Sequence, residues 1–262
     1  MKLTKMQGAG NDYLYADETR RPSPARSQIP ALCDRHFGLG ADGVIFLGCS
    51  DRADLRMSVF NADGSPAEVC GNALRCVARY AVEFRLVPQR ELTIESGCGV
   101  HRARVEGDRV SVSFPRPRLR FCRQPFSLGG QTWELTGINA GNPHAVLFCE
   151  EPAAVPLEAL SRALRDSPLF PQGVNLEAAA FSPGRLRVCV YERGSGYTLA
   201  CGSGACACAV AAEALFGAKG SLTVALPGGE LVVGLGENEL LLSGEAKTVF
   251  ITEIPDQRFA QG

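Results

Sequence analysis

Cys70-Gly71-Asn72-Ala73-Leu74 and Cys201-Gly202-Ser203-Gly204-Ala205 each set a cysteine and small residues in front of a stretch with helical spacing. The two Cys-Gly pairs lie 131 residues apart. Two more segments recur at offsets of 131 and 130 residues: Ala9-Gly10-Asn11 as Ala140-Gly141-Asn142, and Leu92-Thr93-Ile94 as Leu222-Thr223-Val224. Because these anchors keep one order and nearly one offset, we interpret the chain as a duplication of a single plan.

The periodicities around these anchors repeat as well. Residues 55–60 and 186–191 alternate apolar and polar side chains, which predicts a strand before each Cys-Gly pair. Apolar residues then follow helical spacing over 74–82 and 205–216, and further helices are expected at 157–164 and 29–36. Many short strands and few helices predict an α+β fold of two pseudo-symmetric lobes, each a curved, mostly antiparallel sheet around a central helix.

The best candidate for a linker is Pro115-Arg116-Pro117. The expected lobes are therefore residues 1–116, with Cys70, and residues 117–262, with Cys201, although the C-terminal strand could return to the first lobe. If a pseudo-two-fold axis relates the lobes, equivalent helix ends would face one another, which predicts an active site in the cleft between them.

Composition restricts the partners of the chain. It has 262 residues, with 27 Lys and Arg against 28 Asp and Glu, so no bulk charge attracts nucleic acid or an anionic membrane. No stretch approaches 18 uninterrupted apolar residues, and the first residues lack the apolar core of a signal peptide. We therefore expect a cytoplasmic protein without a nucleic-acid or membrane partner.

The chain has 11 cysteines but no Cys-x-x-Cys pair, which argues against a structural metal site. No Gly-x-x-x-x-Gly-Lys loop is present and no lysine has the setting of a Schiff base, so we expect neither a nucleotide nor pyridoxal phosphate. Nine of the thiols are predicted to pack as small core residues: Cys33, Cys49, Cys76, Cys98, Cys122, Cys149, Cys189, Cys206 and Cys208.

Cys70 and Cys201 stand where a loop is expected to turn into a helix. The first turn of a helix has unpaired backbone N–H groups and a partial positive charge, and both favour a thiolate. This predicts a lowered pKa for each of the two thiols. The residues that follow, Gly71-Asn72 and Gly202-Ser203, would let a carboxylate approach the same N–H groups. For either site alone, the alternative is a packing cysteine beside a tight turn.

Duplication favours the chemical interpretation. Two sulfurs on opposite sides of one carbon could remove a proton from one face and deliver another to the opposite face, which is racemisation or epimerisation. Several polar residues near the motifs suit a substrate with several charged groups: Asn11, Asn61, Asn72, Asn142, Glu192 and Arg193. His144 follows Asn142-Pro143 and could tune a nearby thiol.

The sequence resembles the diaminopimelate epimerases, which are cofactor-independent enzymes of lysine and peptidoglycan precursor synthesis. The matching stretches run across the chain: Lys5–Asp12, Phe60–Asn72, Gly141–His144, Val190–Cys206, Leu226–Gly229 and Val249–Phe250. The resemblance implies an isomerase that interconverts LL- and meso-2,6-diaminopimelate without pyridoxal phosphate or metal. It also implies a small-molecule amino-acid substrate, and we expect a homodimer.

The same resemblance assigns roles to individual residues. Cys70 and Cys201 would be the acid–base pair. Asn11, Asn61, Asn142, Asn175 and Arg193 would hold the substrate, and Asn175 is named only through this resemblance. The pairs Gly71-Asn72 and Gly202-Ser203 would bind the reacting carboxylate, Glu192 would meet the amine, and His144 and Glu192 would tune the thiols.

Two positions depart from the family pattern. Some members have Gln within the segment that reads Gly40-Ala41-Asp42-Gly43 here, and Tyr197 replaces a frequent Glu. A racemase of another amino acid, such as histidine or glutamate, is therefore the alternative within enzymes. From a different class, the alternative is a thiol redox sensor or an amino-acid-binding module.

Overall fold

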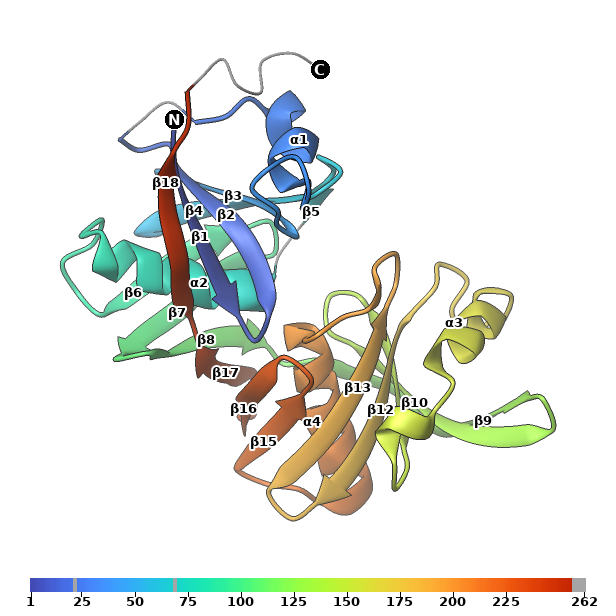
Figure 1. Ribbon diagram of the computed structural model, residues 1–262. Helices are drawn as coiled ribbons and strands as arrows, with labels where there is room; N and C mark the ends of the chain where they lie inside the picture. The colour runs from blue at the N-terminus through green and yellow to red at the C-terminus, as the bar shows by residue number, and fades with distance from the viewer. Residues whose placement is uncertain (21–22, 68–69, 256–262) are drawn as a thin grey trace. The chain divides into compact units, whose positions relative to one another are not determined.

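The computed structural model describes residues 1–20, 23–67 and 70–255 of the chain (Figure 1). These residues form two compact units: a first lobe of Met1–Val112 with the described part of Ser243–Gly262, and a second lobe of Ser113–Leu242. The chain thus divides after Val112, close to the expected boundary at residue 116, and again after Leu242, so that the C-terminal strand belongs to the first lobe. The strands β8 (Arg109–Pro115) and β17 (Glu239–Glu245) run through these two points of division.

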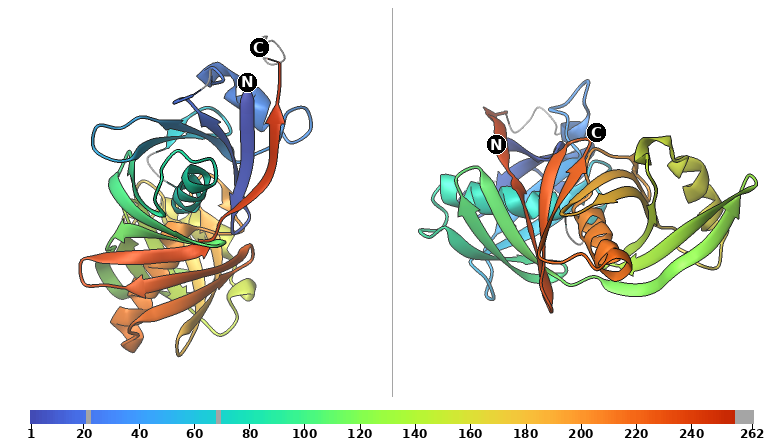
Figure 2. Two further views of the ribbon diagram at one scale, coloured as in Figure 1. Left: turned by 90° about the vertical axis from the view of Figure 1, so that its left-hand side faces the viewer. Right: turned by 90° about the horizontal axis from the view of Figure 1, so that it is seen from below.

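In the first lobe, a mostly antiparallel sheet curves around one long helix, α2 (Gly71–Glu83), which is seen nearly end-on in Figure 2, left. The strands follow the order β18-β1-β2-β3-β4-β6-β7-β8, and β5 pairs with β4. The bounds of the other elements are β1 (Lys2–Gly8), β2 (Asn11–Asp17), η1 (Arg26–Gln28), α1 (Ile29–Cys33), β3 (Gly43–Gly48), β4 (Leu55–Asn61), β5 (Pro66–Ala67), β6 (Glu91–Ser96), β7 (Gly99–Glu106) and β18 (Lys247–Glu253).

The second lobe repeats this plan around α4 (Gly202–Phe216), as Figure 2, right, shows. Its strands follow the order β9-β10-β11-β12-β13-β15-β16, and β14 pairs with β13. The bounds of the other elements are β9 (Arg118–Leu128), β10 (Gln131–Asn139), β11 (Pro143–Phe148), η2 (Pro152–Ala154), α3 (Leu157–Arg165), β12 (Asn175–Ser182), β13 (Arg185–Glu192), β14 (Gly196–Tyr197), β15 (Ser221–Leu226) and β16 (Gly229–Leu235).

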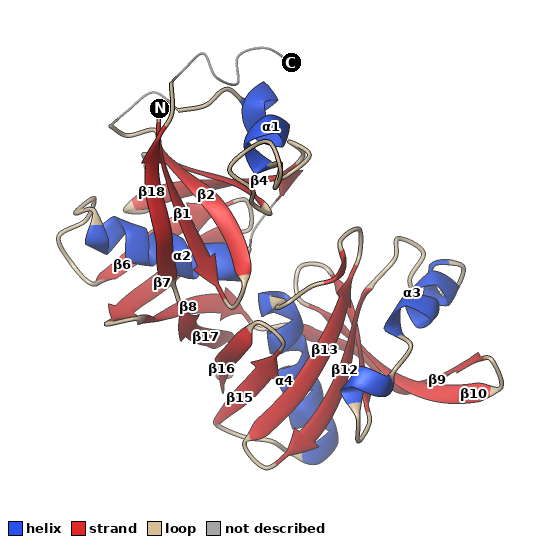
Figure 3. Ribbon diagram, viewed as in Figure 1, coloured by secondary structure: helices blue, strands red, loops and turns tan. Residues whose placement is uncertain are grey.

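The two lobes agree in strand register as well as in element order. Each contains two parallel pairs: β2–β3 and β4–β6 in the first lobe, and β11–β12 and β13–β15 in the second. Figure 3 shows the predominance of strands over helices in both lobes. Equivalent residues pair in both: Tyr13 with Gly43 and His144 with Asn175, then Leu55 with Ile94 and Leu186 with Val224. The prediction of two related α+β lobes, each a curved sheet around a helix, is confirmed.

The composition of α4 explains how a sheet can surround it. From Gly204 to Ala212 every side chain is buried, and all but Val210 are glycine, alanine or cysteine. Such small side chains let strands approach the helix from several directions. The helix ends at Gly217, whose φ of 68° is left-handed and therefore favours glycine. No helix among the described residues is long and apolar enough to cross a membrane.

Two sequence predictions about the outer parts of the fold are wrong. Cys49, Cys98 and Cys122 are exposed rather than packed in the core, and Cys149 and Cys189 are half-buried. The exposed thiols lie after β3, in the turn between β6 and β7, and on β9, most of whose side chains face solvent.

The other wrong prediction concerns α1, which ends at Cys33 and not near His36. Asp34 leaves the helical region with φ −57° and ψ 127°. Its carboxylate instead accepts hydrogen bonds from the backbone N–H groups of His36 at 2.7 Å and Phe37 at 2.6 Å. These bonds start a turn, which is the usual local competition of an aspartate with helix continuation.

Candidate active site

The two cysteines of the repeated motif occupy equivalent positions. Cys70 is the N-cap residue of α2, with φ −131° and ψ 119°, and Cys201 is the N-cap residue of α4, with φ −119° and ψ 114°. An extended N-cap residue holds its side chain beside the first N–H groups of the helix. The structure thus places both sulfurs at helix N-termini, as the spacing predicts.

Cys70 lies within a small polar network of the first lobe. Its Sγ donates to Oδ1 of Asn11 at 3.1 Å, and Nδ2 of Asn11 donates to Oδ2 of Asp42 at 2.7 Å. The Tyr13 hydroxyl also forms hydrogen bonds with Cys70 and Asn11. Burial, and next the neighbouring Cys70, raises the pKa of Tyr13 well above its usual value, so this hydroxyl stays protonated.

A buried arginine adjoins this network. Arg75 is fully buried, and its guanidinium donates to Oδ1 of Asn72 at 2.7 Å and to the Gly71 carbonyl at 3.4 Å. Asn72 in turn directs its Nδ2 to Oδ1 of Asn11 at 3.5 Å. Sequence reasoning missed Arg75. The available signal was a cation in the second turn of a helix, close to the N-terminus where the helix dipole disfavours it.

Asn11 bonds to a network of four charged residues, which are Lys5, Asp12, Arg35 and Asp42. Arg35 donates to Asp12 and to Asp42, each at 2.7 Å, and Lys5 forms an ion pair of 2.7 Å with Asp12. Burial raises the pKa of Asp12, but the hydrogen bonds and charges of Arg35 and Lys5 outweigh burial and lower it overall. The Asp12 carboxylate therefore stays charged beside Asn11.

Cys201 has a different environment. Its Sγ accepts from the Gly204 N–H at 3.3 Å and lies 3.4 Å from Oγ of Ser203, and the thiol also forms a hydrogen bond with Glu192. Burial, and then the negative charges of Glu192 and Glu177, raises the pKa of Cys201 well above its usual value. The sequence prediction of a lowered pKa is therefore wrong for Cys201, because burial and two carboxylates outweigh the helix N-terminus.

Glu192 completes this group of polar residues at the end of β13. Its Oε1 accepts from the Thr198 hydroxyl at 2.5 Å. Burial raises the pKa of Glu192, while the hydrogen bonds from Thr198 and Cys201 act in the opposite direction. A carboxylate in hydrogen-bond contact with the Cys201 thiol can change the pKa of this thiol.

A second carboxylate, which sequence reasoning missed, lies beneath the same helix end. Glu177 is fully buried and its Oε1 accepts from Nδ1 of His144 at 2.7 Å, while Nε2 of His144 bonds with Oδ1 of Asn142 at 2.9 Å. Oε2 of Glu177 has no hydrogen-bond partner among the described residues. The signal for Glu177 was a carboxylate between Leu176 and Ala178 in an otherwise apolar strand.

Gly204 is required by this arrangement. A Cβ at this position would lie 2.6 Å from Oε1 of Glu177 and 3.3 Å from Sγ of Cys201. In the first lobe the equivalent of Glu177 is Ile45 and the equivalent of Gly204 is Ala73, which has its Cβ. The carboxylate and the glycine thus occur together in one lobe and are both replaced in the other.

Gly204→Ala should therefore destabilise the protein and reduce activity. In an open helix position this change stabilises by about 1 kcal/mol, so a lower free energy of unfolding would report the clash with Glu177. Urea unfolding and steady-state kinetics measure the two effects. The matched control is Ala73→Gly in α2, which should cost about 1 kcal/mol from helix propensity and a further cost from the loss of its buried methyl group. Full activity with raised stability in Gly204→Ala would contradict the expectation.

The structure brings most of the predicted site residues together within each lobe. Asn11, Cys70 and Asn72 are linked in the first lobe, and Cys201, Ser203 and Glu192 in the second.

Three other predicted site residues, Asn61, Asn175 and Arg193, form hydrogen bonds outside these two groups. Asn175 accepts from the Arg193 backbone N–H at 2.9 Å, and the Arg193 guanidinium donates to the Gln172 carbonyl at 2.9 Å. Asn61 closes its own turn by donating to the Ser65 hydroxyl at 3.0 Å.

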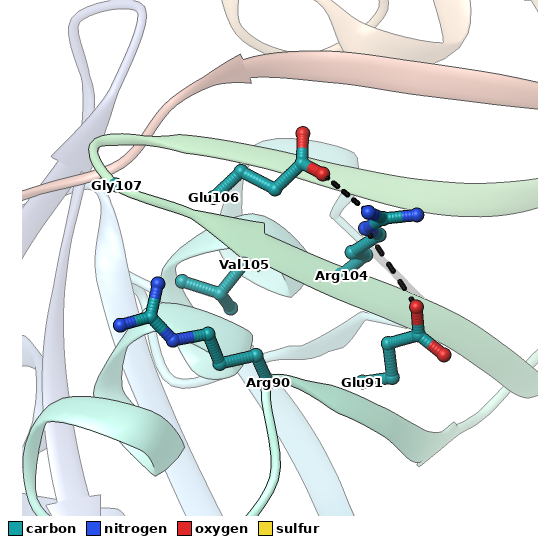
Figure 4. A pocket seen from close by; sticks show the side chains of 6 residues that line it. All are labelled: Arg90, Glu91, Arg104, Val105, Glu106 and Gly107. Atoms are coloured by element: carbon teal, nitrogen blue, oxygen red, sulfur yellow. Dashed lines mark ion pairs between the residues drawn. The ribbon is translucent and has the colours of Figure 1, made fainter.

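One surface pocket of about 460 Å³ lies elsewhere, beside β6 and β7 (Figure 4). It is lined by Arg90, Glu91, Arg104, Val105, Glu106 and Gly107, none of which is a predicted site residue. Arg104 forms ion pairs with Glu106 at 2.7 Å and Glu91 at 3.6 Å. Among the described residues no group of three or more His, Cys, Asp or Glu side chains could hold a metal ion.

Solved structures share this fold. A probable proline racemase from Agrobacterium radiobacter aligns over 97% of this chain and 92% of its own, with a TM-score of 0.74 and 15% identity. A phenazine biosynthesis protein of the PhzF family from Bacillus anthracis aligns over 97% and 99%, with a TM-score of 0.75 and 15% identity. The chain therefore has the two-lobed fold found in racemases, epimerases and PhzF proteins.

Sequence comparison identifies the branch of this fold. A family model described as diaminopimelate epimerase matches residues 3–117 and 136–249. Proteins named diaminopimelate epimerase from Carboxydothermus hydrogenoformans and Agathobacter rectalis are 38% and 37% identical to this chain. The alignments cover 95% and 97% of this chain and 98% and 99% of theirs. The chain belongs to the diaminopimelate epimerase family.

Proposed function

We propose that this chain is an isomerase that interconverts LL- and meso-2,6-diaminopimelate, with Cys70 and Cys201 exchanging the roles of base and acid. The observation that carries the mechanism is the placement of both sulfurs at the N-caps of equivalent helices in two related lobes. Family membership supports the substrate, and hence a place in the synthesis of lysine and peptidoglycan precursors.

The reaction needs one sulfur on each face of the α-carbon. One thiolate removes the α-proton, and the opposite thiol returns a proton to the other face. As the proton leaves, negative charge develops on the carboxylate of the substrate. The N–H groups at the starts of α2 and α4 then stabilise the transition state more than the ground state.

The environments of the sulfurs differ in a way that suits this exchange. The pKa of Cys201 is raised by burial and by the carboxylates Glu192 and Glu177, so this residue rests as a thiol. In the direction in which Cys201 donates its proton, Cys70 acts as the base. In the other direction Cys201 must lose its proton, and Glu192, which contacts the thiol, and His144, which contacts Glu177, tune that step.

The remaining site residues bind the substrate in this proposal. Gly71-Asn72 and Gly202-Ser203 hold the reacting carboxylate, and Glu192 meets the amine. The far end of the substrate is held by Asn11, Asn61, Asn142, Asn175 and Arg193. No pyridoxal phosphate, nucleotide or metal takes part in these steps, and we propose that the enzyme works in the cytoplasm as a homodimer.

A second candidate, a racemase of another amino acid, is favoured by one observation at Gly43. A Cβ there would lie 2.1 Å from the Phe60 carbonyl oxygen and 2.8 Å from the Tyr13 ring, so no larger side chain fits. The polar contact that some relatives make from this segment is therefore absent. Tyr197, the other departure, is 60% exposed. A panel that includes diaminopimelate, histidine and glutamate separates the two candidates.

Exchange in deuterium oxide tests the function directly. During turnover of LL-diaminopimelate, the α-proton signal should disappear while the meso isomer accumulates, both followed by nuclear magnetic resonance. A thiol redox sensor or an amino-acid-binding module would bind without exchange. Folded protein that binds diaminopimelate but exchanges no α-proton would therefore refute the proposal.

A further inference from the structure

The orientation of the Asn11 side-chain amide decides which atom Cys70 meets. An amide has an oxygen that accepts and a nitrogen that donates, and its partners determine which end points where. Toward Cys70 the amide presents Oδ1, at 3.1 Å from Sγ. An acceptor in that place bonds to the S–H of a thiol and does not bond to a thiolate.

Asp42 fixes this orientation from the opposite side. Its Oδ2 accepts from Nδ2 of Asn11 at 2.7 Å and from the Asp12 backbone N–H at 3.0 Å. Its Oδ1 accepts from Arg35 at 2.7 Å. Because a carboxylate only accepts, the amide nitrogen must face Asp42 and the oxygen must face Cys70.

A separate constraint demands the same orientation. The Arg75 guanidinium donates to Oδ1 of Asn72 at 2.7 Å, which leaves Nδ2 of Asn72 to face Asn11. This nitrogen is 3.5 Å from Oδ1 of Asn11. Two charged residues on different elements, Asp42 before β3 and Arg75 in α2, thus select one orientation of the amides beside Cys70.

We propose that Asp42 is a positioning residue that acts through the amide of Asn11 and thereby biases Cys70 toward its thiol form. Asp42 touches neither the sulfur nor the substrate in this role. The role of this bias in turnover rests on the proposed function. The protonation of Cys70 itself can be measured without substrate.

Other titratable groups also face Cys70 and set the background for such a measurement. Tyr13 and Tyr15 extend from β2, and burial raises the pKa of both hydroxyls well above the usual value. Cys76 and Arg75 lie on α2, and burial raises the pKa of Cys76 to about 11 although Arg75 lowers it. A substitution at position 42 acts on one of these groups, because the charge of Asp42 contributes to the raised pKa of Tyr13.

Asp42→Asn provides the sharpest variant, because it keeps the shape of the side chain and removes one acceptor. The new amide has one oxygen for three donors: the Arg35 guanidinium, the Asp12 N–H and Nδ2 of Asn11. Because a charged donor forms the strongest of these bonds, the oxygen would face Arg35, and the Asp12 N–H would lose this acceptor. The nitrogen of the new amide would then point at Asn11, whose amide must turn and present Oδ1 to position 42. Nδ2 of Asn11 would consequently face Cys70 and could donate to a thiolate.

The test is the pH dependence of Cys70 alkylation by iodoacetamide, read by mass spectrometry of the peptide that contains Cys70. Asp42→Asn should lower the midpoint by about one unit, the size expected for exchange of one hydrogen bond. The same substitution in an Asn11→Ala background should leave the midpoint unchanged, because the amide through which Asp42 acts is absent. Asp34→Asn, on an exposed turn next to Arg35, is the matched control and should not shift it.

Three results would overturn the proposal. The midpoint could stay unchanged in Asp42→Asn, the shift could persist in the Asn11→Ala background, or Asp34→Asn could shift it equally. A shift that persists without the Asn11 amide would show that the charge of Asp42 acts on Cys70 through space. An equal shift in Asp34→Asn would show a general effect of surface charge. Failure of deuterium exchange in the wild-type protein would refute the proposed function and leave the alkylation result standing.

Discussion

Cys70→Ala and Cys201→Ala should each abolish epimerisation, with kcat reduced by about 10³-fold, within the range for a positioned acid–base group. The two variants should nevertheless differ in what they exchange. A single remaining sulfur can remove and return a proton on its own face, so each variant should incorporate deuterium without inversion at a centre of one configuration only. One variant should exchange the L centre of LL-diaminopimelate, and the other the D centre of the meso isomer.

Cys208→Ala is the matched control for this experiment. Cys208 is a buried thiol of α4 that lies outside the site, so its removal should cost stability and leave kcat near that of the wild type. The two-base scheme would be excluded if either Cys70→Ala or Cys201→Ala epimerised at nearly the wild-type rate. Exchange of the same centre by both variants would exclude it as well.

Glu177→Gln should have the next largest effect. The substitution removes a negative charge that raises the pKa of Cys201, so the thiol should lose its proton at lower pH. It also replaces the charged partner of His144 Nδ1 by a neutral one. Loss of a charge-assisted hydrogen bond of about 1.5–3 kcal/mol corresponds to a decrease in kcat of about tenfold to a hundredfold.

Two measurements separate these effects. The pH dependence of Cys201 modification by a small thiol reagent reports the protonation of this thiol. The value of kcat reports the weakening of the hydrogen bond between His144 and residue 177. Glu158→Gln is the matched control, because Glu158 forms an exposed ion pair of 2.8 Å with Arg162 on α3 and contributes little. An unchanged modification profile in Glu177→Gln would show that its charge does not act on Cys201.

The parts of the fold that rest on local pattern could be predicted from the sequence. The strands at 55–61 and 185–192 and the two central helices lie where alternation and helical spacing place them. The strand β9 was not predicted, because Pro125 and a run of exposed side chains lack the pattern of a half-buried strand. Its pairing with β10, in which Pro125 lies opposite Glu134, depends on tertiary context.

In the candidate site, too, only the features that depend on local sequence could be predicted. The N-cap positions of Cys70 and Cys201 are local and follow from the motif. Their electrostatic environments come from residues distant in the sequence, such as Glu177 beside Cys201 and Asp42 beside Asn11. The raised pKa of Cys201 could not be derived from the helix N-terminus, because burial and the carboxylates on β12 and β13 outweigh it.

The pairing of β18 with β1 has a consequence for how the protein is made. Lys2 lies opposite Glu253 in this pair, and the backbone groups of Met1 and Ile254 bond to each other at 2.7 and 3.0 Å. The second lobe, by contrast, is one continuous stretch from Ser113 to Leu242. During synthesis on the ribosome the later half of the duplication can therefore fold before the earlier one, whose sheet must wait for the last strand to emerge.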